Sequence, residues 1–253
     1  MEGARKLGLR VTAEGEDNNY DLGMIMDGQT GFEHNAGYVP LYSDVTRFFG
    51  LAKAVYSATL MVVGPGLPWG DQYFRQESEV WKDEKQRDWL PSMSLMRTRR
   101  RPLRPVTDYP HPILAQGMAD IIAAGGYGAV GSHGQQHGIG SHWDVWIMES
   151  AMGSMGALEV ASLHGAHFLG AEHDIGSIEV GKLADLMILN SNPLDNIRNT
   201  ADMKYVMKAG ALYDAMTLDE IWPEQKPFGE HNWVKPDVLR GDSRPVNYWD
   251  LQH

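Results

Sequence analysis

The chain contains no cysteine among its 253 residues, so disulfide bridges, thiolate metal ligands and cysteine nucleophiles are all excluded. It also has no apolar run near the ~20 residues that a membrane-spanning helix requires. Its first residues lack the apolar stretch of a signal peptide. We therefore expect a soluble protein that has no membrane partner, and the sequence leaves its compartment unknown.

Basic residues are scarce as well: 22 Lys and Arg stand against 33 Asp and Glu, and the net charge is −11. Broad binding to a phosphate backbone depends on clustered basic residues, so this balance argues against a nucleic-acid partner. The arginine run at residues 97–101, together with Arg104, could still hold an anion or a nucleic acid. A solvated or salt-bridged surface is the expected interpretation in so acidic a chain.

Apolar residues make up 43% of the chain, which is enough for a sizeable core. Short β-rich runs alternate with helical stretches over the first two thirds, as in a parallel sheet with crossover helices. The expected strands are residues 9–13, 31–34, 57–63 and 127–130, and the expected helices are residues 20–26, 41–53 and 112–124. A helix capped by Ser154 and closed by Gly170 should follow. A small antiparallel unit then comes from residues 177–180, 184–190, 205–208 and 211–213.

The segment between Pro65 and Pro110 is too long for a routine loop, which marks it as functional or partly disordered. It carries five aromatic residues: Trp69, Tyr73, Phe74, Trp81 and Trp89. Because so many aromatic side chains favour burial, we expect ordered packing, as a lid or a partner surface.

Candidate metal ligands lie where the expected strands end. Glu14 follows the first strand, His34 ends the second and His133 follows the fourth. The carboxyl ends of parallel strands gather functional groups, so these three side chains could converge on one ion. Imidazole and carboxylate ligands together suit zinc or another borderline divalent metal, which would activate a water molecule for hydrolysis. The alternative is that each is an ordinary polar residue at a strand end.

Residues 131–143 are rich in glycine and contain the imidazoles of His133, His137 and His142. Their spacing matches neither a helical zinc motif nor a phosphate-binding loop, and no Gly-x-Ser-x-Gly elbow of a serine hydrolase occurs in the chain. We assign His137 and His142 as candidate substrate-binding residues. The alternative, stronger for these two than for His133, is that they hydrogen-bond to the backbone.

The sequence resembles the amidohydrolase superfamily in several motifs. These are Gly-Ser-Ile-Glu-Val-Gly-Lys-Leu-Ala-Asp-Leu at residues 176–186, Asn-Pro-Leu at 192–194 and Val-Met-Lys-Ala-Gly at 206–210. More narrowly it is similar to the imidazolonepropionase- and prolidase-like branch, often fused to a β-propeller, through Gly-Ser-His-Gly-Gln at 131–135 and His-Trp-Asp at 142–144. The resemblance covers almost the whole chain.

The resemblance implies an α/β fold, namely the C-terminal half of a (β/α)8 TIM-type barrel plus strands of a small β-sandwich. Residues 1–170 would be barrel strands five to eight, with the aromatic-rich insertion at residues 65–110. Residues 171–222 would supply sandwich strands, and residues 223–253 an extended C-terminal tail. The His-x-His pair that the superfamily carries on strand one is absent from this sequence. We therefore expect an oligomer or a missing N-terminal half, because the half barrel would leave two sheet edges unpaired.

On this alignment His34 matches the strand-six histidine of the superfamily. Glu14 stands where a strand-five histidine is usual, and His133 stands where a strand-eight aspartate is usual. The implied metal ligands are thus Glu14, His34 and His133, with His133 also the catalytic residue and a divalent ion, expected to be zinc, as cofactor.

The function that follows is a metal-dependent hydrolase of C–N bonds in a small amide, cyclic amide or peptide-like substrate, incomplete as an isolated chain. The alternative is a non-catalytic remnant, a binding or assembly module that keeps the amidohydrolase fold. The missing His-x-His pair favours the alternative for this chain alone.

Overall fold

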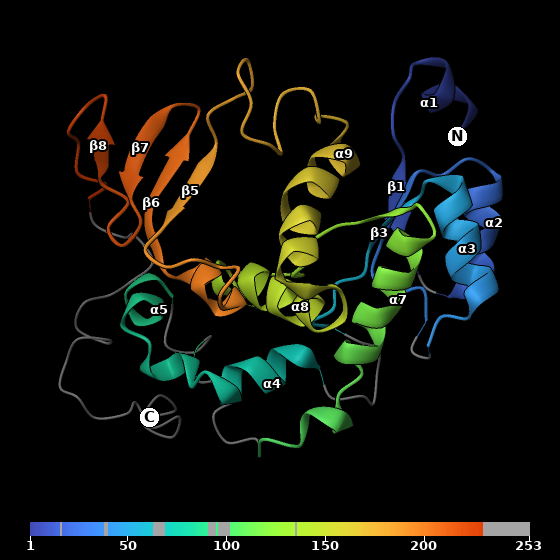
Figure 1. Ribbon diagram of the computed structural model, residues 1–253, viewed down its shortest axis with the longest axis horizontal. Coiled ribbons are helices and arrows are strands. Elements are labelled where there is room, and N and C mark those ends of the chain that lie inside the picture. Colours follow the sequence, from blue (N-terminus) through green and yellow to red (C-terminus); the bar gives the residue numbers. More distant parts are fainter. Residues whose placement is uncertain are drawn as a thin grey trace, which may run out of the picture.

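The structure is a computed structural model that describes residues 1–15, 17–37, 40–62, 69–90, 95, 102–134 and 136–229. It contains a parallel sheet and a separate antiparallel sheet, each of four strands. Figure 1 shows the two sheets at opposite sides of the molecule, with the long helix α8 between them. The expected α/β fold is therefore confirmed.

The parallel sheet has the strand order β1-β2-β3-β4, so each strand pairs with the one before it in the chain. Its strands are β1 (Thr12–Glu14), β2 (Gly31–Glu33), β3 (Val55–Ser57) and β4 (Tyr127–Gly128). The helices of this region are α1 (Glu2–Lys6), α2 (Asn18–Met26), α3 (Ser43–Ala52) and α7 (His111–Ala123). Sequential parallel strands joined by helices are typical of α/β folds, including successive units of a (β/α)8 barrel.

Local sequence explains why these elements begin and end where they do. The Asp17 side chain caps α2 by accepting a hydrogen bond from the Tyr20 amide at 3.0 Å. Helix α3 ends in Lys53, whose φ of 57° closes the helix in the left-handed conformation. The apolar side chains of the strands and of α3 then pack into one core.

The sheet core is aromatic. The rings of Phe32 and Phe49 meet edge-on at 5.6 Å, and those of Phe49 and Tyr56 at 5.7 Å. All three side chains are fully buried, which places the core between the sheet and α3.

Two sequence predictions about strands are wrong. The third strand covers Val55–Ser57 and not residues 57–63, because the chain turns at Leu60 and Met61. No strand forms at residues 177–180, where Ile178 and Val180 are 88% and 109% exposed. β-branched residues alone do not make a strand when no neighbouring strand pairs with them.

The helical region after β4 starts earlier than the sequence predicted. Helix α8 covers Ile139–Glu159, a π-helical segment covers Val160–His164 and α9 covers Gly165–Leu169. Gly153 breaks α8 with a φ of 72°, so the predicted start near Ser154 marks a kink inside a longer helix. Gly170 closes the region in the left-handed conformation, as predicted.

The antiparallel sheet has the order β5-β6-β7-β8. Its strands are β5 (Leu186–Leu189), β6 (Met203–Lys208), β7 (Ala211–Asp214) and β8 (Glu220–Trp222), and the short helix η4 (Ile197–Ala201) precedes β6. The antiparallel strands predicted at residues 205–208 and 211–213 are confirmed: β6 and β7 pair as a hairpin around Ala209 and Gly210, whose φ values of 50° and 86° suit a tight turn. Strand β8 was not predicted from the sequence.

The described part of the predicted insertion is helical and packed. It contains α4 (Gly70–Glu77), η1 (Val80–Lys82), α5 (Glu84–Trp89) and η2 (Val106–Asp108). Phe74 stacks on the buried Trp143 of α8 with ring centroids 5.9 Å apart. Arg75, which is fully buried, donates to Asp71 at 2.7 Å. The arginine run at residues 97–101 and the tail from residue 230 onward lie outside the described residues.

Within the described ranges, no helix is both long and apolar enough to cross a membrane.

Candidate functional site

The carboxyl edge of the parallel sheet carries three unusual backbone turns. His34 directly follows β2, Thr59 lies two residues after β3, and His133 lies beyond β4. Their φ values are 69°, 42° and 56°, in the left-handed region that non-glycine residues seldom adopt. Such conformations cost free energy and concentrate at functional sites.

These turns bring polar side chains together. The Nε2 atom of His34 lies 3.4 Å from Glu14 Oε1, and the imidazole rings of His34 and His133 have centroids 4.8 Å apart. The Nδ1 atom of His34 lies 3.1 Å from the Thr59 hydroxyl. Glu14, His34 and His133, which the sequence proposed as metal ligands, thus form one strand-end cluster.

The donor chemistry of this strand-end cluster suits a divalent ion. Thr59 holds the Nδ1 side of the His34 ring, so Nε2 faces Glu14 and is the nitrogen placed for a ligand. Glu14 and His34 are 77% and 26% exposed, so both can be reached from solvent. However, no group of three His, Asp or Glu residues in the described part of the chain is arranged to hold a metal. The cluster fits part of a ligand set and not a complete one.

A buried carboxyl group supports the loop that carries His133. Asp144 of α8 is fully buried, and its Oδ2 accepts a hydrogen bond from the Gly131 amide at 3.0 Å. Burial is the main cause that raises the pKa of Asp144 from 3.8 to about 7, and the hydrogen bond from the Gly131 amide acts in the opposite direction. Asp144 therefore supports the backbone of the loop after β4.

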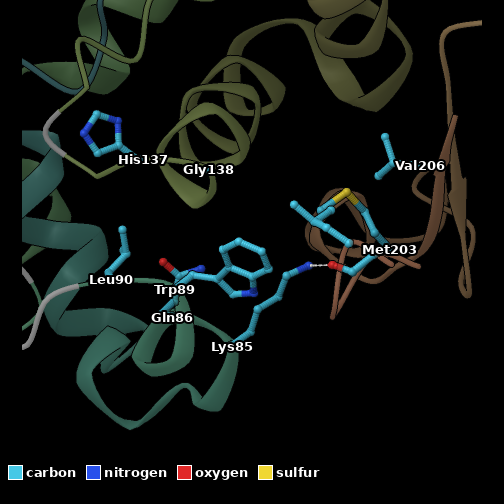
Figure 2. A pocket seen from close by; sticks show the side chains of 10 residues that line it. Lys85, Gln86, Trp89, Leu90, His137, Gly138, Met203 and Val206 are labelled. Atoms are coloured by element: carbon cyan, nitrogen blue, oxygen red, sulfur yellow. Dashed lines mark hydrogen bonds between the residues drawn. The ribbon is translucent and has the colours of Figure 1, made fainter. Parts of the chain in front are cut away.

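His137 and His142 contact a different region. His137 lines a cavity together with residues of α5 and of the antiparallel sheet (Figure 2). Burial, together with a smaller effect of the nearby charge of Lys85, lowers the pKa of His142 to about 4, so His142 is neutral at pH 7. Their assignment as substrate-binding residues stays a prediction.

Sequence reasoning missed Thr59, Asp144 and Lys85. Thr59 lies inside the strand predicted at residues 57–63, so no sequence pattern indicated the left-handed turn at this residue. Asp144 entered the sequence analysis only as part of the His-Trp-Asp motif at residues 142–144. An aspartate between apolar residues in a helix is nevertheless a signal of a buried carboxyl group. Nothing in the sequence pointed to Lys85, because its neighbours in the cavity come from distant segments.

The fold is similar to several solved structures. A Xaa-Pro dipeptidase with methionine bound in its active site matches with a TM-score of 0.58 at 21% identity, over 84% of this chain and 47% of that one. A putative prolidase from Bifidobacterium longum matches with a TM-score of 0.56 at 20% identity, over 94% and 52%. Ochratoxinase from A. niger matches with a TM-score of 0.53 at 19% identity, over 84% and 43%. The chain thus spans about half the length of these proteins.

No curated protein matches the sequence. The model of the amidohydrolase family matches residues 146–213, which run from α8 to the end region of β7. Residues 146–213 are thus similar to the amidohydrolase family, and the fold of the chain is similar to about half of these dipeptidase and prolidase structures.

Proposed function

We propose that this chain provides part of the active site of a metal-dependent hydrolase that cleaves C–N bonds in amide or peptide-like substrates. The observation that carries the proposal is the strand-end cluster, in which Glu14 at the end of β1 lies beside His34 and His133, both in left-handed turns at the same edge of the sheet. The family match and the hydrolase neighbours support the reaction class.

In the proposed site, Glu14 and His34 would hold a divalent ion, with zinc as the expected metal. When bound, the ion supplies an activated water and polarises the scissile carbonyl. Thr59 keeps the His34 ring oriented through its contact with Nδ1. His133 has its ring against that of His34 and would act as a further ligand or move a proton to the leaving nitrogen.

The rest of the ligand set would come from outside the described residues. β1 and β4 are the edges of the parallel sheet, and each pairs with one strand within the described chain. An unpaired edge is a ready template for a further strand. We propose that a longer polypeptide or a second chain supplies strands at these edges and completes both the barrel and the metal site.

A second candidate function is a binding or assembly module that has lost catalysis. Two observations favour it: the sequence has no His-x-His pair, and the described residues include no three-ligand metal group. The fold would then serve to present a surface and not to activate water.

Metal content separates the two candidates. The purified chain would be incubated with zinc, dialysed and analysed for bound metal, alongside His34→Ala and the control His173→Ala, which changes a histidine on an exposed loop. Bound zinc that only His34→Ala removes would support the hydrolase. Retention of bound metal in His34→Ala would favour the module, and so would absence of bound metal even after a chain that completes the barrel has been added.

A further inference from the structure

A cavity of about 530 Å³ lies where α5, the glycine-rich loop and the antiparallel sheet meet. It is lined by Lys85, Gln86, Trp89, Leu90, His137, Gly138, Met203, Val206, Ala215 and Leu218. Figure 2 shows Trp89 and Leu90 on one side and Met203 and Val206 on the other. The volume falls in the range of about 300–1,000 Å³ that small-molecule sites usually have.

The walls of the cavity are mainly apolar, so they would accept a hydrophobic body. The indole of Trp89 offers an aromatic face, and the side chains of Met203, Val206 and Leu218 complete the surface. The thioether of Met203 can make favourable contacts with an aromatic ring. An aryl group is thus a good match for these walls.

Lys85 is the charged group that lines the cavity. Its Nζ donates a hydrogen bond to the carbonyl oxygen of Ala215, which uses one of the three ammonium donors. None of the ion pairs in the described part of the chain involves Lys85. The carboxylates of Asp83 and Asp214 are near enough to act on it electrostatically, and the neutral His142 also lies close.

Two other polar side chains of the lining also make hydrogen bonds. Trp89 Nε1 donates to the Met216 carbonyl at 3.0 Å, and Gln86 Oε1 accepts from the buried Gln136 at 3.0 Å. Lys85 and Trp89, one helical turn apart in α5, therefore bind consecutive carbonyls of the β7–β8 connection. These contacts position α5 against the β7–β8 connection, and among the described lining residues the ammonium of Lys85 supplies the positive charge that an anion requires.

We propose that this cavity binds a small apolar carboxylate, with an aryl or branched alkyl body against Trp89, Met203 and Val206 and the carboxylate on Lys85. A half-buried ammonium gains a charge-assisted hydrogen bond from such a ligand, which a neutral ligand of the same shape cannot supply. None of the lining residues belongs to the strand-end cluster. The inference therefore holds whether or not the chain hydrolyses anything.

The test is calorimetric titration of the full chain with 4-phenylbutyrate and with 4-phenylbutan-1-ol, which has the same body and no charge. We expect saturable binding of the acid at one site and at least tenfold weaker binding of the alcohol. Lys85→Met should abolish this preference, whereas Lys82→Met, which removes an exposed lysine from the same insertion, should keep it. Met203→Trp, which fills the cavity, should weaken both ligands.

Several results would overturn the proposal: no saturable binding of the acid, equal binding of acid and alcohol, or equal effects of Lys85→Met and Lys82→Met. Circular dichroism would confirm that each variant is folded. If Lys85→Met does not fold, the ratio of acid to alcohol binding in the unchanged chain and the weaker binding of both ligands by Met203→Trp still decide the question.

Discussion

Asp144 should make the stability of the fold fall as the pH rises from about 4 to about 7. Its pKa is 3.8 in the unfolded chain and about 7 in the folded one, because burial disfavours the carboxylate. Between these two values the folded state holds a proton that the unfolded state has released. Raising the pH therefore favours unfolding, so the contribution of Asp144 is complete below pH 4 and is lost as the pH passes 7.

The size of the effect follows from the shift. One pKa unit corresponds to about 1.4 kcal/mol, so a shift of roughly three units gives about 4 kcal/mol as the full change in the free energy of unfolding. Asp144→Asn removes the ionisation and keeps an oxygen that can accept from Gly131. The free energy of unfolding of this variant should lose the pH dependence that Asp144 causes. Any other effect of the new amide on stability should be the same at every pH.

The assay is urea unfolding followed by tryptophan fluorescence at pH values from 4 to 8. Relative to Asp144→Asn, the unchanged chain should lose up to about 1.4 kcal/mol per pH unit between pH 5 and 7. The control Asp195→Asn, on an exposed loop, should follow the unchanged chain. Parallel curves for the chain and Asp144→Asn would refute the reasoning, as would a relative gain in stability with rising pH.

Two further substitutions test the packing around the site. Asp71→Ala removes the carboxylate that accepts a hydrogen bond from the fully buried Arg75 at 2.7 Å. It should lower the free energy of unfolding, measured with urea, by about 3–5 kcal/mol. A loss under about 1 kcal/mol, typical of a surface ion pair, would contradict this expectation. Gly50→Ala places a Cβ atom 2.5 Å from the carbonyl oxygen of Ala124, where α3 meets α7, and should cost about 1–3 kcal/mol. Gly3→Ala, which has no neighbouring atom within 4 Å, is its matched control, and equal stability of the two variants would show that the close approach does not matter.

Much of the local structure could be predicted because it depends on neighbours in the chain. Helical stretches, the Gly170 closure and the hairpin at Ala209 and Gly210 follow from capping, glycine conformations and hydrophobic periodicity. The positions of Glu14 and His34 at strand ends also follow from the pattern, since parallel strands present their carboxyl ends at one edge. Sequence motifs alone indicated the amidohydrolase resemblance.

Other features depend on contacts between distant segments, which no local pattern contains. The extent of β3 depends on how much of β2 it can pair with. The burial that shifts the pKa of Asp144 arises only when α8 packs against the loops after β3 and β4.

The sequence by itself thus determined the alternation of strands and helices, the family resemblance and the ligand types at the strand ends. The tertiary structure decided which of these side chains meet. It brought the His34 side chain into contact with those of Thr59 and His133. It did not assemble a complete metal site among the described residues. It also assembled the Lys85 cavity from segments more than a hundred residues apart. The physical reason is that propensity and capping act over a few residues, whereas burial and electrostatic environment exist only after the chain has folded.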